Sequence, residues 1–290
     1  FDFYYIVRHH GKEIYKGRIE DIQAEPGQTV TSPFLNGIPV VNNSTGDVRI
    51  EFYAAIRTPE PFLPAGTVIA REQTYVYTFH KENAPKQAFA DSEDNGRQVI
   101  FSGADFKATF DKQSGLLVSY QYKKQEFIHN GQGPRPFFWR APTDNDYGAK
   151  LPVRLKAWKE ASYQEPKAES FNVARDKDTT AVKVTYRFPQ TDARWDITYK
   201  VYGNGVIKVD NHFVAENAQT PMIPRVGLRM QLPARITSLT YYGRGPEENY
   251  RDRRTSQFIG EYTSGIKDMY EPYVRPQENN HRTDIYWCTL

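Results

Sequence analysis

The stretch FFWRAPTDNDYG, residues 137–148, places three aromatic side chains directly before a guanidinium, two carboxylates and an amide. Such a combination suits a sugar site, because a pyranose ring offers apolar C–H faces together with hydroxyl groups that need polar partners. It also suits a rigid turn, in which Asp and Asn side chains accept hydrogen bonds from nearby backbone N–H groups. The residue types alone leave both interpretations open.

Asp144 and Asp146 are the carboxylates of this stretch, and the chemistry to consider is acid–base catalysis on a glycosidic bond. A retaining glycosidase holds its two carboxyl groups about 5–5.5 Å apart on opposite sides of the scissile bond. Two carboxylates so close together in a turn do not readily straddle a substrate. We therefore expect them to organise the turn or to accept sugar hydroxyls at a pocket rim, and Gly148 is a candidate hinge for a moving loop.

A second polar cluster joins the segments YYGRGPEENYRDRR (241–254) and PYVRPQENNHRTD (272–284). His281 is a candidate acid or base, although the sequence identifies no carboxylate partner for it. The alternative is a charged surface loop, in which Glu278 pairs with Arg282 across a turn. The candidate residues of this cluster are Glu247, Asn249, Asp252, Arg253, Glu278, His281 and Arg282.

Composition excludes several other classes of function. Cys288 is the only cysteine, which rules out an intramolecular disulfide, and the six histidines are scattered without metal-ligand spacing. The net charge of +3 comes without a long run of one sign, whereas a nucleic-acid surface needs concentrated basic residues. No apolar stretch reaches the roughly 20 residues that cross a bilayer. We expect no metal, no cofactor, no nucleic acid and no membrane.

The elements that must position these residues are predicted to be strands, because apolar and polar residues alternate with period two along most of the chain. In DVRIEFYAAI (47–56) the apolar residues share one face, and Arg49 and Glu51 lie on the other, which predicts a half-buried strand. The same pattern recurs in residues 71–79, 181–188 and 225–232. An aromatic content of 14% agrees with β structure.

Turn and helix signals lie between the predicted strands. Gly203-Asn204-Gly205 separates two alternating segments and predicts a hairpin, because Asn and Gly accept positive φ. One short helix is expected in LPVRLKAWKEA (151–161), where Leu151, Leu155 and Trp158 share a face. Polar residues accumulate in 81–96, which we interpret as a linker between a small β-sandwich (1–80) and a larger β domain (97–290).

Three segments together resemble one family. FFWRAPTDNDYG, YYGRGPEENYRDRR and PYVRPQENNHR occur in the order, and at roughly the spacing, seen in the C-terminal part of β-galactosidases of glycoside hydrolase family 2. The resemblance covers essentially the whole chain. It implies an all-β fold: an immunoglobulin-like β-sandwich for residues 1–80, then a large antiparallel supersandwich akin to galactose mutarotase for residues 97–290, incomplete at its C-terminus.

The resemblance also implies what this chain does. In that family the two catalytic glutamates and the divalent metal belong to a barrel upstream of this region, so we expect a non-catalytic fragment of a retaining β-galactosidase that is inactive alone. The fragment is expected to buttress the barrel and to supply a loop at the rim of the galactoside pocket. Its expected partner is the rest of the parent chain. The rim residues implied by the resemblance are Arg140, Asp144, Asn145, Asp146, Tyr147 and Gly148.

Two other classes of function stay open from the sequence. One is a free-standing carbohydrate-binding module that stacks exposed aromatic side chains on sugar faces. The other is a mutarotase-like epimerase in which His281 and Glu247 or Glu278 serve as acid and base. A homo-oligomer also stays open, and a single cysteine does not decide between the bacterial cytoplasm and the periplasm.

Overall fold

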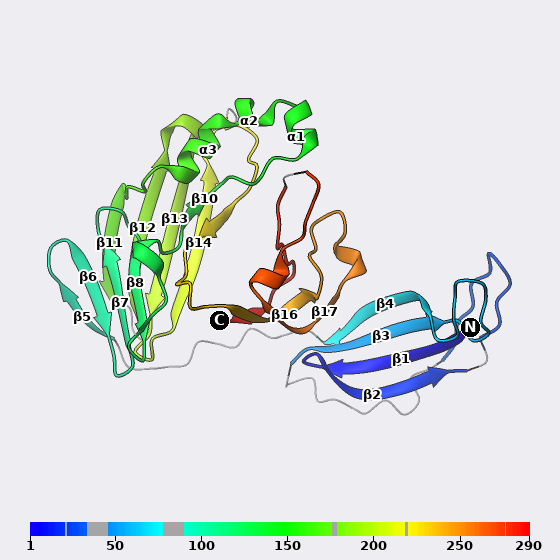
Figure 1. The fold of residues 1–290 in the computed structure, drawn as a ribbon. Helices are drawn as coiled ribbons and strands as arrows, with labels where there is room; N and C mark the ends of the chain where they lie inside the picture. Colours follow the sequence, from blue (N-terminus) through cyan, green and yellow to red (C-terminus); the bar gives the residue numbers. More distant parts are fainter. Residues whose placement is uncertain (21, 34–45, 78–89, 176–178, 218–219, 276) are drawn as a thin grey trace. The chain divides into compact units, whose positions relative to one another are not determined.

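The computed structural model describes residues 1–20, 22–33, 46–77, 90–175, 179–217, 220–275 and 277–290. As predicted, the fold is all-β: antiparallel sheets dominate, and the helices of the described residues are short (Figure 1). The chain forms two compact units, of which the first comprises residues 1–83, 237–271 and 279–290. The second comprises residues 84–236 and 272–278. Within the described residues, no helix is long and apolar enough to cross a membrane.

The N-terminal part of the first unit is a four-stranded antiparallel sheet with the order β2-β1-β3-β4. Tyr5, Val7, Val48 and Ile50 form its small apolar core. The strands are β1 (Asp2–His9), β2 (Lys12–Ile19), β3 (Val48–Ala55) and β4 (Val68–Tyr77).

Strand β3 confirms the strand predicted within residues 47–56, but it is not half-buried. Arg49 and Glu51, predicted on a solvent face, are only 8% and 4% exposed. A second sheet of the same unit, β17-β16-β18, supplies partners for this polar face. The Arg49 Nη2 atom donates to the Tyr286 hydroxyl over 3.1 Å, next to that sheet's last strand. Pattern alone could not reveal a polar partner almost 240 residues away.

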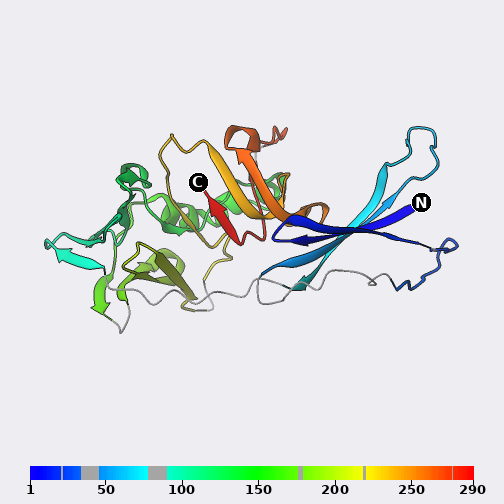
Figure 2. The same ribbon diagram turned by 90° about the horizontal axis from the view of Figure 1, so that it is seen from below.

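The second sheet of this unit comes from the end of the chain. Its strands are β16 (Ser238–Gly245), β17 (Phe258–Gly265) and β18 (Trp287–Thr289). Figure 2 shows β18, in red, beside β16, with which it pairs antiparallel. The side-chain amide of Gln73 on β4 exchanges two hydrogen bonds with the backbone of Ile259 on β17, at 2.8 and 2.9 Å. These bonds tie the N-terminal sheet to the C-terminal strands.

The second unit packs two antiparallel sheets around one large apolar core. The rings of Phe110 and Tyr199, one from each sheet, lie 5.1 Å apart between centroids. The predicted hairpin at Gly203-Asn204-Gly205 is confirmed, since it joins β13 to β14. One sheet contains β5 (Asp91–Asp94), β6 (Gln98–Ser102), β7 (Phe106–Asp111), β8 (Leu117–Tyr122) and β9 (Gln125–Glu126). The other contains β11 (Ser170–Arg175), β12 (Thr180–Phe188), β13 (Ala193–Val201) and β14 (Ile207–Ala215).

A separate pair of short strands, β10 (Arg135–Phe137) and β15 (Gly227–Arg229), completes the second unit. The prediction of a half-buried strand over residues 225–232 is wrong in extent and in burial. Val226, Leu228 and Met230 are 51%, 38% and 48% exposed. The reason is that only three residues find a partner strand, so the alternating side chains have no sheet to pack against.

The helical region differs from the single helix predicted over residues 151–161. It contains α1 (Asp144–Gly148), α2 (Leu151–Arg154) and α3 (Lys156–Tyr163). Leu155 has φ −111° and ψ 22°, which interrupts the helix between α2 and α3. The predicted apolar face is confirmed, because Leu155 and Trp158 are buried in the core and Leu151 packs against it. Short 3-10 turns occur at His129–Gly131, Pro189–Thr191, Arg254–Ser256 and Lys267–Met269.

The predicted domain boundaries stay a prediction. Most of the predicted linker, 81–96, lies outside the described residues, and its described part includes strand β5 (Asp91–Asp94). The two compact units divide the chain differently from the predicted domains, since residues 237–271 and 279–290 group with residues 1–83.

Candidate functional site

The aromatic half of the stretch 137–148 lies in the core of the second unit. Phe138 is fully buried, and its ring centroid lies 4.7 Å from that of Trp158 and 5.3 Å from that of Trp195. Trp139 is 7% exposed. These contacts anchor the start of the segment, so its polar half begins from a fixed point.

The polar half folds into helix α1, and Asp146 organises its N-terminus. The Asp146 Oδ2 atom accepts a hydrogen bond from the Thr143 backbone N over 2.8 Å, and the Thr143 hydroxyl accepts one from the Asp146 N over 3.4 Å. This reciprocal pair is a capping box. The Arg140 Nη2 atom donates to Asp146 Oδ1 over 2.7 Å. The Asp146 carboxylate therefore holds a backbone N–H group, that of Thr143, as one of the two sequence interpretations predicted.

The charge state of Asp146 follows from these contacts. Burial raises the pKa of the carboxyl group, but the hydrogen bonds from Thr143 and the guanidinium of Arg140 outweigh it, so the pKa lies below its ordinary value. A carboxyl group with a lowered pKa is a poor proton donor near neutral pH. We conclude that Asp146 is ionised and that its role is to stabilise the turn.

Four of the six predicted rim residues are accessible. Asp144, Asn145, Tyr147 and Gly148 are exposed on α1, and the Tyr147 side chain is 58% exposed. The Asp144 carboxylate lies 3.7 Å from the Arg275 guanidinium, a loose and solvent-exposed ion pair. Arg140 and Asp146 are less exposed, and their ion pair stabilises the helix that carries the four accessible residues.

Glu278 joins this segment, which differs from the prediction that it belongs to the second polar cluster and pairs with Arg282. Its Oε1 atom accepts a hydrogen bond from the Ala141 backbone N over 2.9 Å, and its Oε2 atom lies 3.0 Å from the Arg225 Nη1 atom. Arg282 instead donates from Nε to the Tyr241 hydroxyl over 3.0 Å. The spacing of four residues suggested a turn, but the chain between them passes from the second unit back to the first.

The second polar cluster is organised around Asn249, which is fully buried in the first unit. Its Nδ2 atom donates to the carbonyls of Arg244 and Glu247 over 2.8 and 2.9 Å. Its Oδ1 atom accepts from the Thr283 backbone N over 2.9 Å and from the Thr283 hydroxyl over 2.6 Å. The amide thereby fastens the segment after β16 to the segment before β18.

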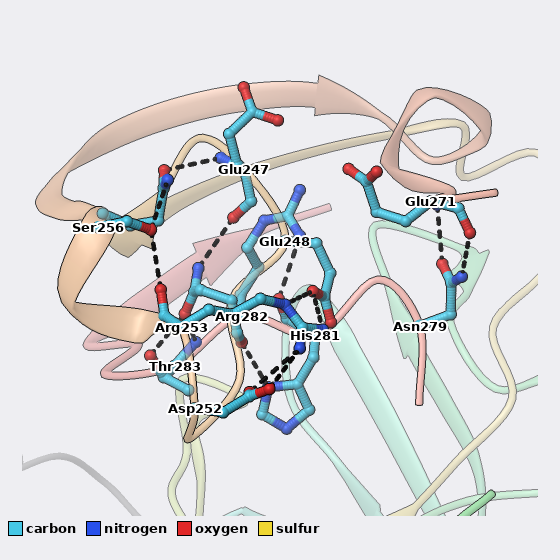
Figure 3. A network of polar contacts seen from close by, with 12 residues as sticks. Glu247, Glu248, Asp252, Arg253, Ser256, Glu271, Asn279, His281, Arg282 and Thr283 are labelled. Atoms are coloured by element: carbon cyan, nitrogen blue, oxygen red, sulfur yellow. Dashed lines mark hydrogen bonds and ion pairs between the residues drawn. The ribbon is translucent and has the colours of Figure 1, made fainter. Parts of the chain in front are cut away.

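His281 lies next to Asn249. Its Nδ1 atom is 3.0 Å from the Asn249 carbonyl oxygen, and its ring stands edge-on to that of Tyr250 with centroids 4.6 Å apart. A carbonyl only accepts, so Nδ1 carries the proton in this contact. Figure 3 shows the exposed Glu247 carboxylate directed away from His281. The pair His281 and Glu247 is not arranged here as an acid and a base.

An ion-pair group completes the cluster. Glu248 is 6% exposed, and its Oε2 atom accepts from both Arg253 Nε, over 2.8 Å, and Arg253 Nη2. Asp252 lies at the surface, 3.1 Å from Arg253. Sequence reasoning left out Glu248, because a glutamate within a run of charged residues gives no signal of burial. Of the predicted cluster, Glu247, Asn249, Asp252, Arg253, His281 and Arg282 do come together in the first unit.

No group of three or more His, Cys, Asp or Glu side chains suited to a metal ion occurs in the described ranges. The prediction that this chain holds no cofactor stays a prediction. The fold itself defines the class of the protein as an all-β protein built from packed antiparallel sheets.

Comparison with known proteins then gives the family. Residues 102–290 match the family described as "Beta galactosidase small chain". The chain belongs to this family. The resemblance to β-galactosidases inferred from three motifs is therefore confirmed.

The relatives are β-galactosidases that are much longer than this chain. The enzyme of Priestia megaterium is 35% identical over 198 residues, which are 68% of this chain and 19% of that protein. The enzyme of Lactobacillus delbrueckii subsp. bulgaricus is 31% identical over 97% of this chain and 27% of its own length. That of Halalkalibacterium halodurans is 29% identical over 97% and 28%. The chain thus spans less than a third of the length of these relatives.

Proposed function

We propose that this chain is a non-catalytic part of a retaining β-galactosidase of glycoside hydrolase family 2. The observation that carries the proposal is the use of buried and half-buried carboxylates in both polar clusters. Asp146 caps a helix, Glu278 holds the Ala141 backbone, and Glu248 pairs with Arg253. Carboxylates bound in this way are not poised to flank a glycosidic bond as nucleophile and acid.

In this proposal the catalytic barrel, with its two glutamates and its divalent metal, is supplied by the rest of the parent chain. This chain buttresses the barrel and presents α1 at the rim of the galactoside pocket. The exposed side chains of Asp144, Asn145 and Tyr147 offer hydroxyl acceptors, an amide and an aromatic face. The anchored Phe138 and the Arg140–Asp146 pair hold these groups in place.

The experiment replaces the matching region of the Lactobacillus delbrueckii β-galactosidase with this chain. We expect the chimera to hydrolyse a chromogenic β-galactoside, the same enzyme lacking the region to be inactive, and the purified chain alone to give no turnover. Turnover by the chain alone, abolished by Asp144→Asn or Glu247→Gln, would contradict a non-catalytic role.

The two alternatives have their own readouts. A carbohydrate-binding module would bind galactose in calorimetry with at least millimolar affinity. An epimerase would speed the equilibration of α- and β-galactose and would lose this activity in His281→Ala. We expect no epimerase activity, since the Nδ1 atom of His281 faces a backbone carbonyl rather than a carboxylate.

A further inference from the structure

A polar cavity of about 270 Å³ lies in the second unit, outside both candidate clusters. It lies where strands β10 and β15 meet the C-terminal end of helix α3, and Figure 1 shows β10 close to that helix. The side chains that matter in its lining are those of Gln132, Arg135, Tyr163, Glu165 and Arg229. Two of these five are arginines.

The two arginines are direct cross-strand neighbours, because Arg135 on β10 is paired in register with Arg229 on β15. Like charges directly opposite each other on two strands destabilise a sheet. Arg135 is also only 8% exposed. Burial lowers the pKa of Arg135, nearby Glu165 opposes this effect, and Arg229 adds to it. A guanidinium still keeps its proton at neutral pH, so both charges persist.

The contacts of the two guanidinium groups pair neither of them directly with a carboxylate. Arg135 donates from Nη1 to the Gln132 Oε1 atom over 3.1 Å and from Nη2 to the Gln164 carbonyl, both neutral acceptors. The Arg229 guanidinium lies 5.3 Å from the ring centroid of Phe137 and 5.6 Å from that of Tyr163. In the part of the chain that the structure describes, neither arginine has a carboxylate within 4.0 Å.

Contacts within the chain hold the two arginine side chains in place, so the site is formed before any ligand binds. The aromatic rings hold Arg229, and the neutral acceptors hold Arg135. A buried charge is costly unless it is paired. We propose that this cavity binds a carboxylate group between Arg135 and Arg229.

The charge of the cavity selects the class of ligand. Two guanidinium groups and the Glu165 carboxylate leave a net charge of +1 (two minus one), which one carboxylate neutralises. A phosphate dianion would leave excess negative charge beside Glu165. The planar fork of a guanidinium also matches the two oxygens of a carboxylate. The carboxylate could be borne by a small free acid or by an Asp or Glu side chain from the rest of the parent protein.

The test titrates the full chain with sodium acetate at constant ionic strength, with sodium chloride and sodium phosphate as comparison salts. We expect acetate to raise the midpoint of thermal unfolding above the chloride baseline, and above phosphate. Arg229→Gln should weaken acetate binding about tenfold, as for the loss of one charge-assisted hydrogen bond. Glu165→Gln should tighten acetate binding, since it removes the opposing charge.

Lys183→Gln is the matched control, because it removes an exposed cation of β12 outside the cavity. It should leave acetate binding unchanged. Equal losses in Lys183→Gln and Arg229→Gln, no effect of acetate beyond chloride, or tighter binding of phosphate would overturn the proposal. Arg229 is exposed, so its variant should fold even if an Arg135 variant does not.

The chimera with the Lactobacillus β-galactosidase separates the two sources of the carboxylate. If acetate binds both the chain and the chimera, the ligand is a free acid. If acetate binds only the isolated chain, an acidic side chain of the parent protein fills the cavity. Both outcomes support a carboxylate site, and the absence of acetate binding to the chain alone contradicts it whatever the chimera does.

Discussion

Asn249 and Thr283 are joined by two hydrogen bonds that end on one oxygen: the Thr283 N–H and the Thr283 hydroxyl both donate to Asn249 Oδ1, over 2.9 and 2.6 Å. The Asn249 Nδ2 atom meanwhile serves two backbone carbonyls. One buried amide therefore satisfies four backbone or side-chain groups from two segments of the chain. Few other side chains could do so, because only Asn and Gln combine an acceptor oxygen with two N–H donors.

Asn249→Ala should destabilise the first unit by about 3 kcal/mol, because it leaves several buried polar groups without partners. Urea unfolding followed by hydrogen exchange of the β16 amides checks this value. Asp252→Asn is the control, since the Asp252 side chain is 70% exposed, and it should change stability by less than about 0.5 kcal/mol. Equal unfolding midpoints for the two variants would contradict the role of Asn249.

The stability of the chain should fall in acid partly through Asp146. Its pKa is lowered in the folded protein by Thr143 and Arg140 against the effect of burial. A lowered folded-state pKa stabilises the protein fully above the unfolded pKa, near 3.8, and this stabilisation is lost as the pH falls through the lowered folded value. Asp146→Asn should therefore lose less stability than the wild type between pH 6 and pH 3, as measured by chemical denaturation. A parallel loss in both proteins would contradict the prediction, and Asp144→Asn, at an exposed position, should behave like the wild type.

Tyr242→Phe should weaken the contact between the two sheets of the first unit. The Tyr242 hydroxyl on β16 donates to Asp47 Oδ2, which also accepts from Arg49 Nε over 2.6 Å, and Asp47 is fully buried. We expect a loss of about 1.5 kcal/mol, the range of a hydrogen bond to a charged group. Hydrogen exchange should accelerate in β3 and β16 together.

Tyr4→Phe is the control for this variant, because Tyr4 lies on the N-terminal sheet and stacks on Tyr53, with ring centroids 4.9 Å apart. The exchange rates of β16 should not change in Tyr4→Phe. Acceleration confined to β3 in Tyr242→Phe would show that the hydroxyl does not join the sheets.

Glu278→Ala should loosen the segment before α1 without unfolding the second unit. It frees the Ala141 N–H and the Arg225 guanidinium. The exchange protection of the Ala141 amide should fall at least about tenfold, as expected for an opening made easier by about 1.4 kcal/mol. Glu278→Gln keeps an acceptor oxygen and should retain most of this protection. Similar protection in the Ala variant and the wild type would contradict the contact.

Local pattern predicted the strands better than it predicted what covers them. The period-two alternation around Val48 and Ile50 identified β3, because side chains on a strand alternate whatever lies elsewhere. The burial of Arg49 and Glu51 depends on strands that follow about 190 residues later, and no local pattern contains that information. The same alternation around Leu228 predicted a strand that is mostly unpaired, since partner strands are also a non-local property.

The same difference between local and distant contacts holds for the candidate site residues. The residue types of Thr143 and Asp146, three positions apart, are those of a capping box, so the role of Asp146 in the turn could be predicted. The partners of Glu278 could not, because Ala141 lies 137 positions earlier in the chain.

The first unit takes its strands from both ends of the chain, whereas residues 84–236 of the second unit are continuous. During synthesis, β1 to β4 therefore emerge well before β16 to β18, because residues 78–237 lie between β4 and β16. The face of β3 that bears Arg49 and Glu51 stays uncovered during that interval, and its charges keep it hydrated. The charged face therefore makes the uncovered N-terminal sheet less prone to aggregate until the strands that cover it have been synthesised.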